Sequence, residues 1–328
     1  MLIDSFGRPH QYLRISLTER CNLRCFYCMP AEGIQLSPSQ NIMQAHEIEK
    51  IAQGYVQLGV NKIRLTGGEP LVRKDFSDVY ERLSKLPVQL AITTNGILLD
   101  QYLPLFEKTK MPKINISLDT LDKKKFFSIT RRDYFDKVWS NIQLLLEKNI
   151  HPKINVVLIK GTNDDEINDF IALTKDFPLN IQFIEFMPFQ GNQWNWKKGF
   201  SFKELMSVIG NKFGAENILP LQNIQHSTSR NFHVIGHLGN FGIVSTITNP
   251  FCDSCNRIRL TANGRVKNCL FSNNETDLLT ALRDEKNLIP LMEDNIRHKK
   301  QQRGGKKDFT HEAKNILEDN RSMVLIGG

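Results

Sequence analysis

Six short runs rich in β-branched and apolar residues recur between about residues 10 and 190, separated by segments with helical periodicity. In one such segment, Ile48, Ile51, Tyr55 and Leu58 follow the spacing that places apolar side chains on one helix face. Strands that alternate with helices are typical of a parallel sheet, because parallel neighbours need crossover connections. The expected strands are Tyr12–Leu17, Lys62–Thr66, Gln89–Thr93, Lys113–Leu118, Ile154–Ile159 and Ile181–Phe186.

Six strand–helix units are two fewer than a closed (β/α)8 barrel contains. The pattern therefore predicts an α/β fold, an open and partial (β/α)6 TIM-like barrel with its site at the carboxyl ends of the strands. Polar or glycine-rich segments follow several expected strands and would gather at that rim. They are Thr66–Pro70, Thr94–Gly96, Asp119 and Met187–Pro188.

The pattern changes after about residue 190. Phe202–Phe213 reads as a helix, and Asn231–Ile235 with Phe241–Ile247 reads as a hairpin across a glycine-containing turn. We therefore expect a larger unit over residues 5–225 and a smaller C-terminal region over residues 226–328, packed against the open barrel.

The chain contains six cysteines, and they fall into two groups of three. The first group begins just after the first expected strand, and the second follows the expected hairpin. Three thiolates this close can hold three corners of a [4Fe–4S] cluster and leave the fourth iron free for another ligand. The groups are Cys21-x3-Cys25-x2-Cys28 and Cys252-x2-Cys255-x13-Cys269.

Zinc and dithiol chemistry are the alternatives for these cysteines. Structural zinc normally takes four ligands, and a third cysteine exceeds what a Cys25-x-x-Cys28 dithiol needs. The second group taken alone would suit zinc nearly as well as iron. Its pairing with the first group favours two clusters.

Composition narrows the class of protein only a little. The chain has 328 residues, 40% of them hydrophobic and 24% charged, and a net charge of +8. A basic chain suits nucleic acid, a membrane surface or a small anion. No run of 18 apolar residues is present, and the first residues lack a leader pattern, so we expect a cytoplasmic protein with reduced cysteines.

The densest basic run extends from Arg297 to Lys307 and contains no aromatic residue. We expect a solvated loop here, with a phosphate-binding segment as the alternative.

Two motifs resemble the radical S-adenosylmethionine superfamily. These are the first cysteine group, with Tyr27 before its last member, and the turn Gly67–Pro70. Three further segments resemble one family within it, the GTP 3′,8-cyclases, and the likeness runs over essentially the whole chain. They are Glu185–Pro188, Cys252–Leu260 and the terminal Gly327-Gly328.

The resemblance implies a lyase for the first step of molybdenum cofactor biosynthesis. Reductive cleavage of S-adenosylmethionine would give a 5′-deoxyadenosyl radical that abstracts H3′ of GTP, and C3′ would close onto C8 to form 3′,8-cyclo-7,8-dihydro-GTP. The implied cofactors are two [4Fe–4S] clusters and S-adenosylmethionine, with guanine on the open iron of the second cluster. The implied partners are an electron donor protein and a downstream cyclic pyranopterin monophosphate synthase. Nucleic acid and membrane are not expected as partners, and a homodimer is left open.

The resemblance also assigns roles to individual residues. The six cysteines would bind iron, Gly327 and Gly328 would reach into the active site, and no catalytic side chain is implied beyond the cluster and cofactor ligands. The S-adenosylmethionine contacts would be Tyr27, Gly68, Ser117 and Met187, and the GTP contacts Arg14, Arg64, Thr93, Lys153, Arg257, Ile258 and Arg259.

Physical chemistry supports the arginines independently. Arg14 and Arg64 fall within expected strands, where a buried charge needs a partner, and a triphosphate is one such partner. Arg257 and Arg259 are two residues apart, so they would share a face of an extended segment. A surface or salt-bridged arginine is the alternative at each position.

Two other functions remain open from the residues. A two-cluster radical enzyme that modifies peptides would usually carry more C-terminal cysteines and lack the Gly-Gly end. A zinc- or iron-containing nucleic-acid-binding protein would leave the Gly67–Pro70 turn unexplained.

Overall fold

A single sheet of 12 strands carries the fold in this computed structural model, which describes residues 1–30, 32–192, 194–222, 226–306 and 321–327. The strand order is β12-β11-β10-β1-β2-β3-β4-β5-β6-β9-β8-β7. In chain order the strands are β1 Tyr12–Ser16, β2 Lys62–Thr66, β3 Gln89–Thr94, β4 Lys113–Ser117, β5 Lys153–Leu158, β6 Asn180–Glu185, β7 Ile218–Pro220, β8 Arg230–Val234, β9 Asn240–Val244, β10 Arg257–Leu260, β11 Arg265–Lys267 and β12 Thr276–Asp277.

The six predicted strands are confirmed as β1 to β6, neighbouring and parallel. The expected hairpin is confirmed as antiparallel β8 and β9. The C-terminal part also extends the barrel sheet itself, because β10 pairs parallel with β1 and β9 pairs parallel with β6. Among the described strands, β7 and β12 form the two ends of the sheet and do not pair with each other, so the barrel is open. The division at residue 225 stays a prediction.

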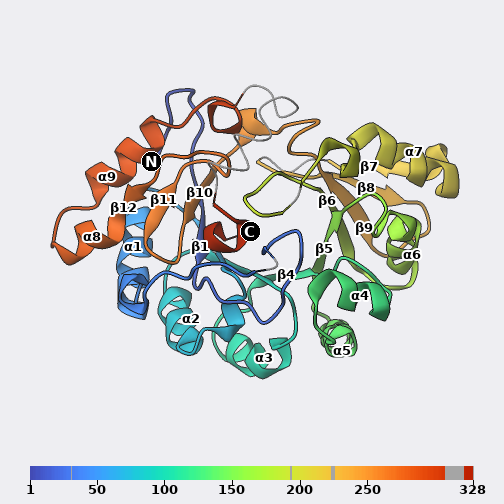
Figure 1. The fold of residues 1–328 in the computed structure, drawn as a ribbon, viewed down its shortest axis with the longest axis horizontal. Helices are drawn as coiled ribbons and strands as arrows, with labels where there is room; N and C mark the ends of the chain where they lie inside the picture. The colour runs from blue at the N-terminus through green and yellow to red at the C-terminus, as the bar shows by residue number, and fades with distance from the viewer. Residues whose placement is uncertain (31, 193, 223–225, 307–320, 328) are drawn as a thin grey trace.

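Helices α1 to α6 lie on the outer face of the curved sheet, whereas the red helical turn near the C-terminus lies inside it (Figure 1). Alternation along β1 explains this arrangement: Leu13 and Ile15 are fully buried in the same apolar core as Ile48 and Ile51, whereas Arg14 faces the inside of the barrel. The helices are α1 Ala45–Gln57, α2 Phe76–Ser84, α3 Leu99–Lys108, α4 Lys123–Thr130, α5 Phe135–Glu147, α6 Ile167–Asp176, α7 Phe202–Phe213, α8 Leu278–Arg283, α9 Ile289–Arg297 and α11 Met323–Ile326.

Helix α7 spans the residues predicted for it, and its start has a local cause. The Ser201 side chain accepts a hydrogen bond from the Glu204 backbone, and the Glu204 carboxylate accepts one from Ser201 in return. None of the helices in the described part of the chain has the length and hydropathy that a membrane crossing requires.

Candidate active site

A cavity of about 1050 Å³ occupies the inside of the open barrel, and all six cysteines line it. Within the described residues, no three ligating side chains converge on a single metal ion. A cluster does not require such convergence, because each thiolate binds a different iron of the cube.

The first cysteine group lies on a loop that α4 holds in place. The backbone amides of Arg24 and Phe26 donate to the carbonyl groups of Thr130 and Ile129. Burial, with the neighbouring Cys21 thiol and Asp119, raises the pKa of Cys28 to about 12.

The other two thiols of this loop behave alike. Burial raises the pKa of Cys21 to about 11 and holds that of Cys25 well above its usual range. Three half-buried thiols with raised pKa values are a donor set suited to a polycation, which stabilises all three thiolates. The residues therefore fit an iron–sulfur cluster.

The turn after β2 holds this cysteine loop against the end of β3. A Cβ on Gly68 would lie 2.3 Å from the carbonyl oxygen of Arg20, so only glycine allows this approach. The Glu69 carboxylate accepts hydrogen bonds from Thr94 Oγ1 at 2.7 Å and from the Asn95 backbone at 2.7 Å. Burial raises the pKa of Glu69 to about 7. This turn thus connects two of the rim segments predicted from the sequence.

The residues predicted to contact S-adenosylmethionine all line the same cavity as the first cysteine group, namely Tyr27, Gly68, Ser117 and Met187. Tyr27 is held by Asp119, whose Oδ2 accepts from the tyrosine hydroxyl at 2.6 Å. Asp119 Oδ1 accepts from the Val157 amide at 2.8 Å, and burial raises the pKa of Asp119 to about 6. The sequence placed Asp119 at the rim but did not indicate that it orients Tyr27.

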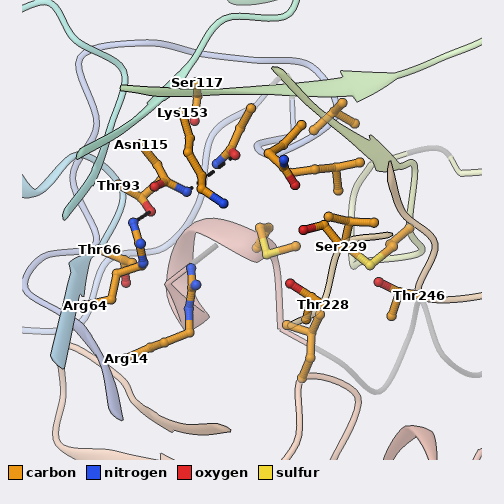
Figure 2. Close-up of a pocket in the computed structure, with 18 of the residues that line it drawn as sticks. Arg14, Arg64, Thr66, Thr93, Asn115, Ser117, Lys153, Thr228, Ser229 and Thr246 are labelled. Carbon is orange, nitrogen blue, oxygen red and sulfur yellow. Dashed lines mark hydrogen bonds between the residues drawn. The ribbon is translucent and has the colours of Figure 1, made fainter. Parts of the chain in front are cut away.

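Three predicted arginines form a row across neighbouring strands. Arg14 on β1 is in register with Arg259 on β10 and with Arg64 on β2. Figure 2 shows Arg14, Arg64 and Lys153 directed into the same space. Like charges side by side in a sheet are destabilising. An anionic ligand would offset that cost.

A second row lies two residues earlier along the same three strands. Tyr12 on β1 is in register with Arg257 on β10 and with Lys62 on β2. Burial alone would raise the pKa of Tyr12, but Arg64 and its cationic neighbours lower it to about 7. Sequence reasoning missed Tyr12 and Lys62, although each is two residues from a predicted arginine and so shares its strand face.

Burial and the mutual repulsion of the cations lower the pKa of Arg14 to about 9 and that of Arg259 to about 10. Burial is the larger cause of both shifts, and the neighbouring arginines add to it.

Arg64 is partly committed to the protein itself. Its Nε donates to the Tyr12 hydroxyl at 2.6 Å, and one terminal nitrogen donates to the Ile92 carbonyl at 2.7 Å and to Thr93 Oγ1 at 3.1 Å. Arg64 and Thr93 therefore lie together, as their shared role predicts.

Ile258 differs from the other predicted contacts, because its fully buried side chain belongs to the apolar core and leaves only its backbone for a ligand.

The second cysteine group is held by the N-terminal segment. One terminal nitrogen of Arg8 donates to the Cys252 carbonyl at 2.8 Å and to the Gln301 carbonyl at 2.6 Å, and the other donates to the Lys300 carbonyl at 3.0 Å. Asp4 pairs with Arg8 at 2.6 Å in a buried ion pair.

The C-terminal tail reaches the arginine row. The Gly327 carbonyl accepts from Arg259 at 2.9 Å, and Gly327 has a φ of +72°. A Cβ at this position would lie 2.5 Å from Thr66 Oγ1, so the tail lies against β2 with no room for a side chain. Gly328, predicted to act beside it, lies outside the described residues.

Comparison with known proteins agrees with this site. Residues 15–174 match the family described as Radical SAM superfamily, and residues 179–304 match Molybdenum Cofactor Synthesis C. The chain is 46% identical to the Arabidopsis thaliana "GTP 3′,8-cyclase, mitochondrial", covering 100% of this chain and 84% of that relative. It is 38% identical to the Listeria monocytogenes "GTP 3′,8-cyclase", covering 100% of this chain and 99% of that relative.

Other relatives are longer. The Homo sapiens "Molybdenum cofactor biosynthesis protein 1" is 43% identical over 99% of this chain, which spans 51% of that relative. Among solved structures, Streptococcus suis SuiB bound to S-adenosylmethionine superposes with a TM-score of 0.64 at 17% identity, covering 88% of this chain and 66% of that chain. That likeness shows the shared fold. With its two cysteine groups, its arginine row and these full-length relatives, the chain belongs to the GTP 3′,8-cyclase family of the radical S-adenosylmethionine superfamily.

Proposed function

We propose that this chain cyclises GTP to 3′,8-cyclo-7,8-dihydro-GTP in the first step of molybdenum cofactor biosynthesis. The observation that carries the proposal is the row of Arg259, Arg14 and Arg64 in a cavity lined by both cysteine groups. Guanidinium groups bind phosphate oxygens in pairs, so the row suits a triphosphate. The curated relatives named for this reaction support it.

The first cysteine group would hold three irons of one [4Fe–4S] cluster, which with bound S-adenosylmethionine supplies a 5′-deoxyadenosyl radical. Tyr27, Gly68, Ser117 and Met187 would surround the cofactor. The hydrogen bond from Tyr27 to Asp119 fixes the tyrosine ring at that side of the cavity. Gly68 allows the backbone to approach the cofactor closely.

The arginine row would orient GTP between the two cysteine groups. Arg14, Arg64, Thr93 and Lys153 would bind one side of the nucleotide, and Arg257, Arg259 and the Ile258 backbone the other. In the reaction, H3′ leaves the ribose and a C3′–C8 bond forms. One electron and one proton then complete the dihydro product. Holding C3′ and C8 in contact is a positioning task, which fixed bidentate contacts perform well.

The second cysteine group would hold a second [4Fe–4S] cluster with an open iron for guanine. Arg257 supports this proposal, because it follows Cys255 closely in sequence and lies 5.3 Å from the Phe251 ring beside the second cysteine group. An electron donor protein, a downstream cyclic pyranopterin monophosphate synthase, a homodimer and a cytoplasmic location stay predictions.

The test is anaerobic reconstitution, followed by incubation with GTP, S-adenosylmethionine and dithionite and by mass analysis of the nucleotides. We expect about eight irons per chain, from two four-iron clusters, and GTP-dependent 5′-deoxyadenosine with one cyclised nucleotide. A fully loaded protein that forms neither would refute the proposal. Stoichiometric zinc would instead favour a nucleic-acid-binding protein, and 5′-deoxyadenosine formed only with a peptide would favour a peptide-modifying enzyme.

A variant pair tests the arginine row directly. Arg14→Met removes its central member, whereas Arg265→Met removes an exposed arginine from β11 nearby. We expect Arg14→Met to lose at least tenfold in kcat/KM for GTP, because hydrogen bonds to charged groups contribute about 1.5–3 kcal/mol, and Arg265→Met to match the wild type. Equal values for the two variants would contradict the assignment.

A further inference from the structure

One lysine of the basic run is buried beside the second cysteine group. Lys299 follows α9 and is 4% exposed, whereas the adjacent Lys300 is exposed. Its Nζ donates to the Sγ of Cys255 at 3.5 Å and to the carbonyl oxygen of Arg257 at 3.0 Å. The prediction of a solvated loop is therefore wrong at Lys299, because the chain turns inward here and places the ammonium group on a thiol.

The backbone that follows makes a second contact of the same kind. The amide of Arg303 donates to the Sγ of Cys252 at 3.4 Å. Two of the three sulfur atoms in the second cysteine group therefore accept an N–H from residues 299–303. Hydrogen bonds to ligating sulfur and nearby positive charge are the main ways in which a protein tunes an iron–sulfur cluster.

The position of Lys299 is set by its surroundings. Arg8 binds the carbonyl groups of Lys300 and Gln301, next to Lys299 in sequence, and also that of Cys252. Arg8 is itself buried and paired with Asp4. Arg8 and Asp4 thus form a clamp that holds the lysine segment and the cysteine segment together, and the N–H···S contact lies between these two segments.

The ammonium group of Lys299 contacts a sulfur atom and a carbonyl oxygen. Within the described residues, Lys299 forms no ion pair with an Asp or Glu side chain, and Arg257 adds a second cation nearby. A buried ammonium group is costly unless it is paired. The Sγ of Cys255, which would carry the opposite charge as a cluster ligand, is the group that the ammonium touches.

We propose that Lys299 is a positioning residue of the second cluster, where its ammonium N–H···S contact with Cys255 stabilises the ligated cluster and raises its reduction potential. A positive charge beside the cluster favours the state that has gained an electron. The proposal rests on the proposed function only in that Cys252, Cys255 and Cys269 hold a cluster. It assigns Lys299 no contact with GTP.

The experiment compares Lys299→Met with Lys300→Met, which removes the same charge from the exposed neighbour. Both are made in the full chain with Cys21, Cys25 and Cys28 replaced by alanine, so that the second cluster alone is observed. The reconstituted proteins are titrated with dithionite, which delivers one electron to each cluster, and the reduced cluster is followed by electron paramagnetic resonance. Iron retained after exposure to a chelator is measured in parallel.

We expect Lys299→Met to disfavour one-electron reduction at least tenfold, which is a fall in midpoint potential of at least about 59 mV. It should also lose iron faster than the wild type. Lys299→Arg, which keeps the charge and a donor, should restore part of both properties. Lys300→Met should match the wild type.

A midpoint potential and iron retention in Lys299→Met equal to those of Lys300→Met would overturn the proposal and leave Lys299 only a structural contact to the Arg257 carbonyl. If Lys299→Met takes up no iron, Lys299→Gln is titrated in its place. Because the glutamine is neutral, a lowered midpoint supports the proposal and an unchanged one overturns it.

These readouts are independent of turnover. A chain that forms no cyclised nucleotide but shows the shift would refute the proposed function and leave the role of Lys299 standing. A chain that forms the product without the shift would do the reverse.

Discussion

Replacing Gly327 by alanine tests whether the C-terminal tail must lie against the arginine row. Gly327 has a φ of +72°, a conformation that costs an L-residue about 1–2 kcal/mol. The added Cβ would lie 2.5 Å from Thr66 Oγ1 and 3.0 Å from Ser16 Cβ, and overpacking of this kind costs about 1–3 kcal/mol. The lower sum, about 2 kcal/mol, reduces the seated population roughly 30-fold at about 1.4 kcal/mol per factor of ten.

Hydrogen exchange and kinetics read out this loss separately. In Gly327→Ala we expect faster amide exchange in the peptide of residues 321–328 and a fall of roughly 30-fold or more in kcat/KM for GTP, with the iron content unchanged. Gly161→Ala is the matched control, because Gly161 has a φ of +74° but open space around its Cβ position. Wild-type exchange or wild-type kcat/KM in Gly327→Ala would refute the reasoning.

Two further predictions concern stability, measured by urea unfolding of the reduced apoprotein. Arg8→Met breaks the buried ion pair with Asp4 and should lower the free energy of unfolding by about 3–5 kcal/mol. Its control, Lys148→Met, breaks an exposed pair with Glu107 and should lower it by about 0–1 kcal/mol. Equal losses in the two variants would contradict the role of Arg8 as a clamp. Glu69 has its pKa raised from 4.5 to about 7 by burial, so the stability it contributes is present below about pH 4.5 and is lost as pH rises through 7. Relative to Glu69→Gln, the wild type should therefore lose about 3 kcal/mol between pH 4.5 and pH 8, and a difference that does not vary with pH would rule this out.

Local periodicity predicted the parallel strands well. Each of these strands must bury one of its two faces, so its apolar residues follow a pattern that can be read from that strand's own sequence. For the same reason, Arg257 and Arg259 were expected to share a face, and both line the cavity from β10. The division of the six cysteines into two groups of three likewise follows from their spacing in the sequence alone.

Pairings between distant segments could not be predicted in this way. Strand β10 joins β1 although more than 200 residues separate them, and only this register reveals the row of Arg259, Arg14 and Arg64. The prediction that Lys299 lies in a solvated loop was wrong for a related reason. A basic run is normally solvated, and the sulfur atom that makes burial of Lys299 favourable lies 44 residues away in sequence.

The central claim is that one cavity holds both the radical source and GTP. It is tested most directly with GTP deuterated at C3′, incubated anaerobically with the reconstituted protein, S-adenosylmethionine and dithionite. We predict that deuterium appears in 5′-deoxyadenosine and that 3′,8-cyclo-7,8-dihydro-GTP forms in equal amount. Formation of 5′-deoxyadenosine without deuterium, or without a cyclised nucleotide, would contradict the account.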